Sequence, residues 1–240
     1  MREIKDFKIE EPPINIGADI SIKSFEIIKS ELTNYPKTKE FNSEELEVII
    51  RLIHTSSCFD EVLESIYFTK DSTNRLKNLL QNGAKIIVDV NMIKVGISDF
   101  YLKKYQNDVI CFVNEPFAFE MAKKNGTTRS YAAVVEAIKR YKDSPLILAC
   151  GNAPTFIYSA INTLLDEGVD LGRVGFILFP VGFVNVVEAK DYGKRFCEYF
   201  NIPAVIMQNR FGGSTMVVAT LHSLFKLIKD YDKDRKYNGK

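Results

Sequence analysis

The feature that most constrains this chain is an alternation of short apolar runs with helical patterns from residue 86 onward. The runs are rich in β-branched residues and are short enough to be strands. They are Ile86–Asp89, Val109–Val113, Leu146–Cys150, Val174–Phe179 and Ala204–Met207. Five repeats of a strand followed by a helix predict a parallel sheet that is covered by helices on both faces. We therefore expect an α/β fold, a doubly wound parallel sheet of about five strands.

The residues before this alternation predict a helical N-terminal region. Asn42 and Ser43 are followed by two glutamates, which is typical of a helix start, and apolar residues then recur at helical spacing as far as Ile53. Three more amphipathic segments complete the region: Ile20–Glu31, Phe59–Phe68 and Thr73–Leu80.

The organisation of the chain predicts a single domain over residues 1–240. No Gly/Ser linker, charge block or internal repeat interrupts the sequence, and this length is ordinary for one α/β domain. We expect an extended arm containing Pro12 and Pro13 before the first helix, and a frayed polar tail at Asp230–Lys240.

The charge balance excludes several classes of partner. The chain has 32 Lys and Arg residues and 31 Asp and Glu residues, so it is close to neutral. It offers no basic stripe for nucleic acid and no polybasic segment for a membrane surface. No apolar run reaches the roughly 18 residues that a membrane span needs, and Met1–Pro13 is charged, unlike the apolar core of a signal peptide. We expect a cytoplasmic protein that binds neither nucleic acid nor a membrane.

The cysteines and histidines predict neither disulfides nor a metal site. The four cysteines form no CxxC pair, which favours reduced thiols that pack as small apolar groups. His54 and His222 are far apart in sequence, and neither lies in a Cys/His cluster with metal-ligand spacing.

The five predicted strand ends carry distinctive loops. Ligands of open parallel sheets bind beyond the carboxyl ends of the strands. The loops there are Asp89–Gly96, Asn114–Pro116, Gly151–Thr155, Pro180–Val184 and Gln208–Ser214. In any one loop Gly and Pro can simply mark a turn, but five such loops at one edge predict a binding site.

These loops predict an anion-binding edge without a nucleotide motif. Neither GxGxxG nor GxxxxGK[ST] occurs, which disfavours a nucleotide-binding α/β enzyme. Backbone N–H groups at helix starts can still hold a carboxylate or a phosphate. Three segments offer such donors: Thr127–Ser130, Asn152–Thr155 and Gly212–Ser214.

His54 has two interpretations from its position. It continues the row of Leu46 and Ile50 on an apolar helical face, so it can be a buried core histidine or an acid/base in a pocket. Cys58 follows four residues later, but no Asp or Asn is placed to orient a Cys–His dyad. His222, inside an apolar stretch, is interpreted as structural.

Six short motifs in one order resemble a known family. They are His54-Thr-Ser, Asp89 to Met92 with Gly96, Thr128-Arg129-Ser130, Gly151-Asn-Ala-Pro-Thr155, Pro180–Val184 with Glu188 and Lys190, and Arg210 to Ser214. Together, from about Ile20 to Leu224, they resemble the precorrin-8X methylmutase family of cobalamin biosynthesis. The resemblance implies a flavodoxin-like α/β domain and a homodimer. It also implies an isomerase that moves a methyl group between adjacent ring C carbons of a tetrapyrrole, precorrin-8X or cobalt-precorrin-8, to give hydrogenobyrinate or cobyrinate.

The resemblance also implies the site residues. His54 matches the family's catalytic histidine, the proton donor, and Arg129 matches its substrate-contacting arginine. With the strand-end loops, the expected substrate-binding set is Thr55, Arg129, Ser130, Asn152, Thr155, Lys190, Arg210, Gly213 and Ser214. The chemistry needs no cofactor and no metal held by the protein; cobalt, where present, belongs to the substrate.

Two departures from the family pattern are visible. Ser57 stands where members often have Gly, and Phe211 replaces a second basic residue before Gly-Gly-Ser. The motifs leave open whether the substrate carries cobalt; a chain rich in Lys, Ile and Asn leans toward the cobalt form. The alternative function is a non-catalytic corrinoid-binding or carrier protein.

Overall fold

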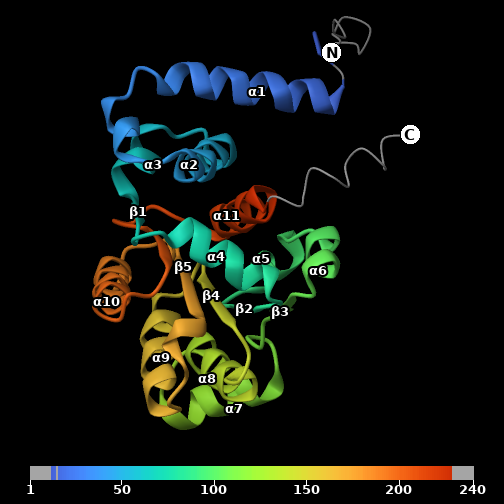
Figure 1. Ribbon diagram of the computed structural model, residues 1–240. Helices are drawn as coiled ribbons and strands as arrows, with labels where there is room; N and C mark the ends of the chain where they lie inside the picture. The colour runs from blue at the N-terminus through green and yellow to red at the C-terminus, as the bar shows by residue number, and fades with distance from the viewer. Residues whose placement is uncertain (1–11, 15, 229–240) are drawn as a thin grey trace, which may run out of the picture.

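A computed structural model describes residues 12–14 and 16–228, and in it a six-stranded sheet lies between two layers of helices (Figure 1). The strands are β1 (Ile66–Phe68), β2 (Lys85–Val88), β3 (Asp108–Ile110), β4 (Leu146–Cys150), β5 (Val174–Leu178) and β6 (Ala204–Met207). Their order is β1-β6-β5-β4-β2-β3. The α/β class and the five parallel strands are confirmed, and β4 and β6 have the predicted bounds.

The prediction of about five strands missed β1, which lies in the segment Phe59–Phe68 that was predicted to be helical. The helix α3 (Asp60–Ser65) covers only the first part of that segment, and Ile66–Phe68 pair antiparallel with β6. Ile, Tyr and Phe favour a half-buried strand, and the unpaired edge of β6 offers backbone partners that no local pattern reveals. The strand predicted over Val109–Val113 is shorter in the structure, where β3 covers only Asp108–Ile110. β3 forms the other edge of the sheet and pairs only with β2.

One layer of helices covers the sheet face on which α2 and α11 pack together (Figure 1). Its members are α1 (Gly17–Leu32), α2 (Ser43–Ser56), α4 (Ser72–Gln81), α5 (Asn91–Gly96), α6 (Asp99–Tyr105) and α11 (Ser214–Leu227). The other layer consists of α7 (Pro116–Asn125), α8 (Arg129–Tyr141), α9 (Pro154–Asp166) and α10 (Val186–Tyr199). Two 3₁₀ turns, η2 (Pro36–Glu40) and η3 (Leu171–Arg173), complete the described elements.

The sheet separates two apolar cores. Successive strand residues point to opposite faces, so Ile86 and Val88 belong to the core under α2 and α11, whereas Ile87 belongs to the core under α8 and α9. Burial on both faces explains why the strands read as continuous apolar runs in the sequence. None of the helices within residues 12–14 and 16–228 is both long and apolar enough to cross a membrane.

The helix α2 begins at the predicted residue through a capping box. The side-chain oxygen of Asn42 accepts hydrogen bonds from the N–H groups of Glu44 and Glu45, at 2.9 and 3.0 Å, and the Glu45 carboxylate accepts one from the Asn42 N–H. The buried face of α2 then packs on α11. The first eleven residues of the predicted arm and the predicted tail Asp230–Lys240 lie outside the described residues.

Candidate functional site

The loops after β4, β5 and β6 meet backbone against backbone at the carboxyl edge of the sheet. A Cβ added to Gly151 would lie 2.6 Å from the Ser214 Cα, and one added to Gly212 would lie 2.3 Å from the Phe179 carbonyl oxygen. The Gly213 N–H donates a hydrogen bond to that carbonyl at 2.8 Å. Glycine is required at both positions because a side chain would separate the loops, so three strand ends form one continuous surface.

The predicted anion-binding donors at Asn152–Thr155 are occupied in part by a side chain of the protein. The Asp89 carboxylate accepts hydrogen bonds from the N–H groups of Gly151 at 3.0 Å and of Asn152 and Ala153 at 2.7 Å each. Asp89 is only 1% exposed; burial raises its pKa, and these hydrogen bonds oppose the rise. The expectation of an external anion on these donors is therefore corrected: Asp89 fixes the loop after β4.

Lys190, like Asp89, is a buried charged side chain that binds the backbone of a loop, here the loop after β6. It is 1% exposed, and its ammonium group donates hydrogen bonds to the carbonyl oxygens of Asn209 and Phe211, at 2.9 and 2.8 Å. Burial lowers the pKa of Lys190 to about 8. The ammonium group thus braces the loop that carries Arg210 and Gly213, and its predicted contact with a substrate carboxylate stays a prediction.

A cavity of about 440 Å³, here called the arginine pocket, collects three predicted site residues from two segments, the start of α8 and the loop after β4. It is lined by Val90, Asn91, Val113, Asn114, Thr128, Arg129, Ser130, Asn152 and Ala153. The Arg129 guanidinium lies 4.6 Å from the ring centroid of Phe119 and is exposed. Thr155 adjoins this group, since its hydroxyl lies 2.7 Å from the Thr128 hydroxyl. The pocket therefore offers a cation and hydroxyl groups to an anionic ligand.

A second cavity of about 440 Å³ lies between α2, α5 and α11. Its lining residues are Arg51, Thr55, Met92, Val95, Gly96, Thr215, Val218, Ala219 and His222. Met92 and Val95 are 61% and 80% exposed, so α5 presents an unusual apolar surface. A Cβ on Gly96 would lie 2.8 Å from Val218, which shows that this glycine lets α5 approach α11. Of the predicted set, only Thr55 lies here.

His54 lies in the last turn of α2, beside Thr55, and is exposed. Its ring stacks on Phe25 of α1, with centroids 4.6 Å apart and an interplanar angle of 21°. The Arg51 guanidinium lies 5.1 Å from the centroid of the same Phe25 ring. The interpretation of His54 as a buried core residue is wrong. Its imidazole is oriented by a stacked ring and accessible to a ligand.

The two departures from the family pattern have physical explanations. Ser57 ends α2 in a left-handed conformation, with φ of +58°, which is the position where glycine is most favourable. Serine adopts it at a cost of about 1–2 kcal/mol. Phe211 packs against the core on the α11 side of the sheet, so this position contributes apolar contact instead of a second charge.

The alternative chemical groups do not assemble around His54. The Cys58 thiol donates a hydrogen bond to the Ser56 carbonyl at 3.3 Å, a local contact that does not involve the imidazole. His222 accepts a hydrogen bond from the Ser98 N–H at 3.1 Å, which supports its structural role, and burial lowers its pKa. Within residues 12–14 and 16–228, no three His, Cys, Asp or Glu side chains gather into a metal-binding group.

The loop after β5 adds an exposed apolar rim next to the remaining predicted arginine. Phe183 and Val184 are 82% and 75% exposed. The Arg210 guanidinium lies 5.1 Å from the Phe183 ring centroid and is itself exposed. Met92, Val95 and Phe183 lie in loops that the sequence predicted to form the binding site, but they were not named as site residues, because only the fold reveals that these apolar side chains are exposed.

Fold and site together define an α/β protein whose carboxyl sheet edge carries exposed arginines and apolar side chains, with an accessible histidine at the end of α2, next to the pocket-lining Thr55. Such an edge suits an enzyme that acts on a large, partly apolar polyanion. Residues 19–227 match the precorrin-8X methylmutase family, and the chain belongs to that family.

Individual relatives agree with this assignment. The chain is 32% identical to a cobalt-precorrin-8 methylmutase of Leptospira interrogans, over 89% of this chain and 94% of that protein. It is 30% identical to a cobalt-precorrin-8 methylmutase of Methanocaldococcus jannaschii, over 89% and 95% of the two chains. The crystal structure of a precorrin-8X methyl mutase from Thermus thermophilus superposes with a TM-score of 0.73 at 31% identity, covering 88% of this chain and 98% of that one.

Proposed function

We propose that this chain is an isomerase of cobalamin biosynthesis. It moves a methyl group between adjacent ring C carbons of precorrin-8X or cobalt-precorrin-8, a tetrapyrrole, and gives hydrogenobyrinate or cobyrinate. Membership of the family and relatives that carry both substrate names support the proposal. The observation that carries it is the position of His54, exposed, stacked on Phe25 and adjacent to Thr55, which lines an apolar pocket.

The site supplies what a methyl migration on a conjugated macrocycle requires. The exposed apolar side chains of Met92, Val95 and Phe183 offer contact to a ring system. Arg129 and Arg210 offer guanidinium groups to peripheral carboxylates, with the loop backbone that Asp89 and Lys190 hold in place. Several such contacts spread around one ligand can fix the macrocycle in a single orientation.

His54 serves as the general acid in this proposal. Its imidazolium donates a proton to the macrocycle, which makes ring C electron-poor and favours the shift of the methyl group to the adjacent carbon. The macrocycle then returns the proton to His54 as its conjugated double bonds rearrange to those of the product. The reaction is therefore an isomerisation with no net change in atoms or electrons.

We further propose a homodimer, the cytoplasm as the location, and no cofactor, with any cobalt belonging to the substrate. The exposed Ile20 and Ile27 of α1, seven residues apart and therefore on one face of the helix, support the dimer, because a helix face with large exposed apolar side chains favours a protein contact. The five parallel strands, numbered among themselves, run 2-1-3-4-5, and this order supports a flavodoxin-like arrangement within one domain.

The test is incubation of the full chain with the metal-free and the cobalt substrate in parallel. We expect the absorption spectrum of one or both to change with turnover to a product of unchanged mass. A corrinoid-binding or carrier protein would bind and shift the spectrum stoichiometrically, without catalytic conversion. A chain that neither converts nor binds either tetrapyrrole would overturn the proposal.

A further inference from the structure

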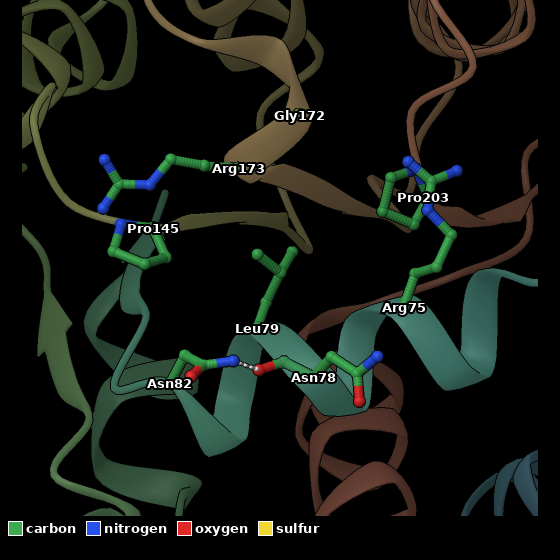
Figure 2. A pocket seen from close by; sticks show the side chains of 8 residues that line it. All are labelled: Arg75, Asn78, Leu79, Asn82, Pro145, Gly172, Arg173 and Pro203. Atoms are coloured by element: carbon green, nitrogen blue, oxygen red, sulfur yellow. Dashed lines mark hydrogen bonds between the residues drawn. The ribbon is translucent and has the colours of Figure 1, made fainter.

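A third cavity lies at the opposite edge of the sheet, at the amino ends of three parallel strands. It has a volume of about 630 Å³. Its lining comes from α4 and from residues that immediately precede β4, β5 and β6 (Figure 2). They are Arg75, Asn78, Leu79, Asn82, Pro145, Gly172, Arg173 and Pro203. Because loops at the two edges of a parallel sheet face opposite ways, a ligand here leaves the candidate methylmutase site open.

The lining of this cavity is cationic. It contains two arginines and no acidic side chain, and neither arginine takes part in an ion pair among the residues that the structure describes. Arg75 makes one long hydrogen bond, 3.4 Å to the side-chain oxygen of Asn201. The neighbouring carboxylate of Asp170 accepts the Gly172 N–H at 3.0 Å and so caps its own turn.

The two arginines lie on opposite sides of the cavity, with Leu79 between them (Figure 2). Asn78 and Asn82 line the side formed by α4, where the Asn82 amide donates to the Asn78 carbonyl at 2.7 Å. A ligand that contacts both guanidinium groups must therefore pass over an apolar side chain. Compact anions such as inorganic phosphate match only one end of this arrangement.

The position of Leu79 is fixed by the packing of α4 on β5. A Cβ added to Gly175 would lie 2.5 Å from Leu76 and 2.9 Å from Leu79, so only glycine lets the helix lie this close to the strand. Leu76 is fully buried at this contact, which anchors the turn of α4 that presents Arg75 and Leu79. The cavity is thus built on rigid elements rather than on a mobile loop.

We propose that this cavity binds a linear dicarboxylate, an anion with a charged group at each end and an apolar chain between. Arg75 and Arg173 bind the two carboxylates, the Asn78 amide adds a hydrogen bond, and Leu79 contacts the methylene groups. The volume is within the range for small-molecule sites. The inference does not depend on the methylmutase reaction, since it concerns a different edge of the sheet and is tested by binding.

The test is calorimetric titration of the full chain with succinate, glutarate and adipate, and with hexanoate and inorganic phosphate as probes of a single charge and a compact anion. We expect one dicarboxylate to bind at least tenfold more tightly than hexanoate or phosphate. Arg75→Gln and Arg173→Gln should each weaken its binding by about tenfold or more. Unchanged unfolding midpoints should show that replacing the half-buried Arg75 or the exposed Arg173 leaves the fold intact.

Two control variants make the result specific. Arg140→Gln removes the same charge from α8, where Arg140 pairs with Glu136 at 2.7 Å, and should leave dicarboxylate binding unchanged. Arg129→Gln should also leave it unchanged, which separates this cavity from the arginine pocket. The proposal is overturned if no dicarboxylate saturates the protein below about 10 mM, if phosphate binds equally well, or if Arg140→Gln weakens binding as much as Arg75→Gln does.

Discussion

At the scale of single residues, the accessible histidine is the group on which the proposed chemistry depends most directly. His54 lies at the end of α2 with its ring stacked on Phe25, so both its exposure and its orientation are defined. We predict that His54→Asn lowers turnover by about 10²–10⁴-fold, equivalent to about 3–5 kcal/mol of barrier, the contribution of a positioned general acid. Corrinoid affinity should be largely retained because many other contacts hold the ligand.

The neighbouring thiol provides the control for this prediction. Cys58→Ser should retain near-normal turnover, because the thiol bonds to the Ser56 carbonyl and not to His54. Single-turnover kinetics with bound substrate separate the two variants. If His54→Asn turned over normally while folded and saturated, His54 would not be the proton donor; if Cys58→Ser were inactive, thiol catalysis would replace the proposal.

Arg129 is the residue whose contribution to binding is most direct. It is exposed in the arginine pocket and supported by the ring of Phe119. We predict that Arg129→Ala weakens substrate binding by about 1.5–3 kcal/mol, the range for a hydrogen bond to a charged group. Arg140→Ala, on the same helix but paired with Glu136, should have little effect. Equal affinities of the two variants in equilibrium titration would refute the assignment.

The buried ammonium of Lys190 predicts a pH dependence of stability. Its pKa falls from 10.5 in the unfolded chain to about 8 in the folded protein, so between these values the unfolded state binds more protons. The free energy of unfolding therefore gains a contribution from Lys190 as pH rises from about 8 to 10.5, by up to about 3 kcal/mol. This rise should be missing in Lys190→Met. Denaturant unfolding of both proteins at several pH values measures the difference; parallel curves would contradict it.

At the scale of elements, the sequence predicts what local patterns determine and misses what distant partners determine. The parallel strands and the start of α2 follow from β-branched runs and from the Asn42 capping box. β1 was missed because only pairing with β6 makes Ile66–Phe68 a strand. The backbone donors after β4 were predicted to await an anion because no local pattern shows that Asp89, 62 residues before Gly151, already occupies them.

The candidate site was predictable to a similar degree. Arg129, Ser130 and Asn152 come together in one pocket, although only Asn152 lies in a strand-end loop and the other two lie at the start of α8, directly after α7. The exposure of His54 was not visible in its apolar row, because it depends on how far distant elements cover the end of α2. Met92 and Val95 lie in the predicted loop Asp89–Gly96, but their exposure depends on how α5 packs against α11 and was not visible either.

The close contact between the loops after β4 and β6 gives a prediction about an element junction. The added methyl group in Gly151→Ala would meet the backbone of Ser214 at 2.6 Å, and the two loops must separate. We predict a loss of about 1–3 kcal/mol in the free energy of unfolding, together with lower turnover. Gly17→Ala is the matched control, since a Cβ there meets nothing within 4 Å, and it should change stability by less than about 0.5 kcal/mol. Equal stability of the two variants would show that the loops adapt freely.

At the scale of the whole molecule, α1 combines two faces with different roles. One face packs on α2 and places Phe25 against His54, while Ile20 and Ile27, seven residues apart and on another face, are 48% and 46% exposed (Figure 1). Exposed isoleucines repeated along one helix are costly in water and favour association with a second copy of the chain. A dimer contact through α1 would also stabilise the packing of Phe25 against His54, the proposed proton donor.

We therefore predict that the protein sediments as a dimer at micromolar concentration, at twice the chain mass of 27.3 kDa. Ile27→Lys should shift it toward the monomer, because an ammonium group would have to be buried in the contact. Leu165→Lys is the control, since Leu165 is 49% exposed on α9, in the other helical layer, and should leave the dimer intact. If association involves α1, turnover of Ile27→Lys should fall together with dimer content as the protein is diluted. A wild-type monomer, or a dimer that Ile27→Lys leaves unchanged, would show that this face of α1 is not the interface.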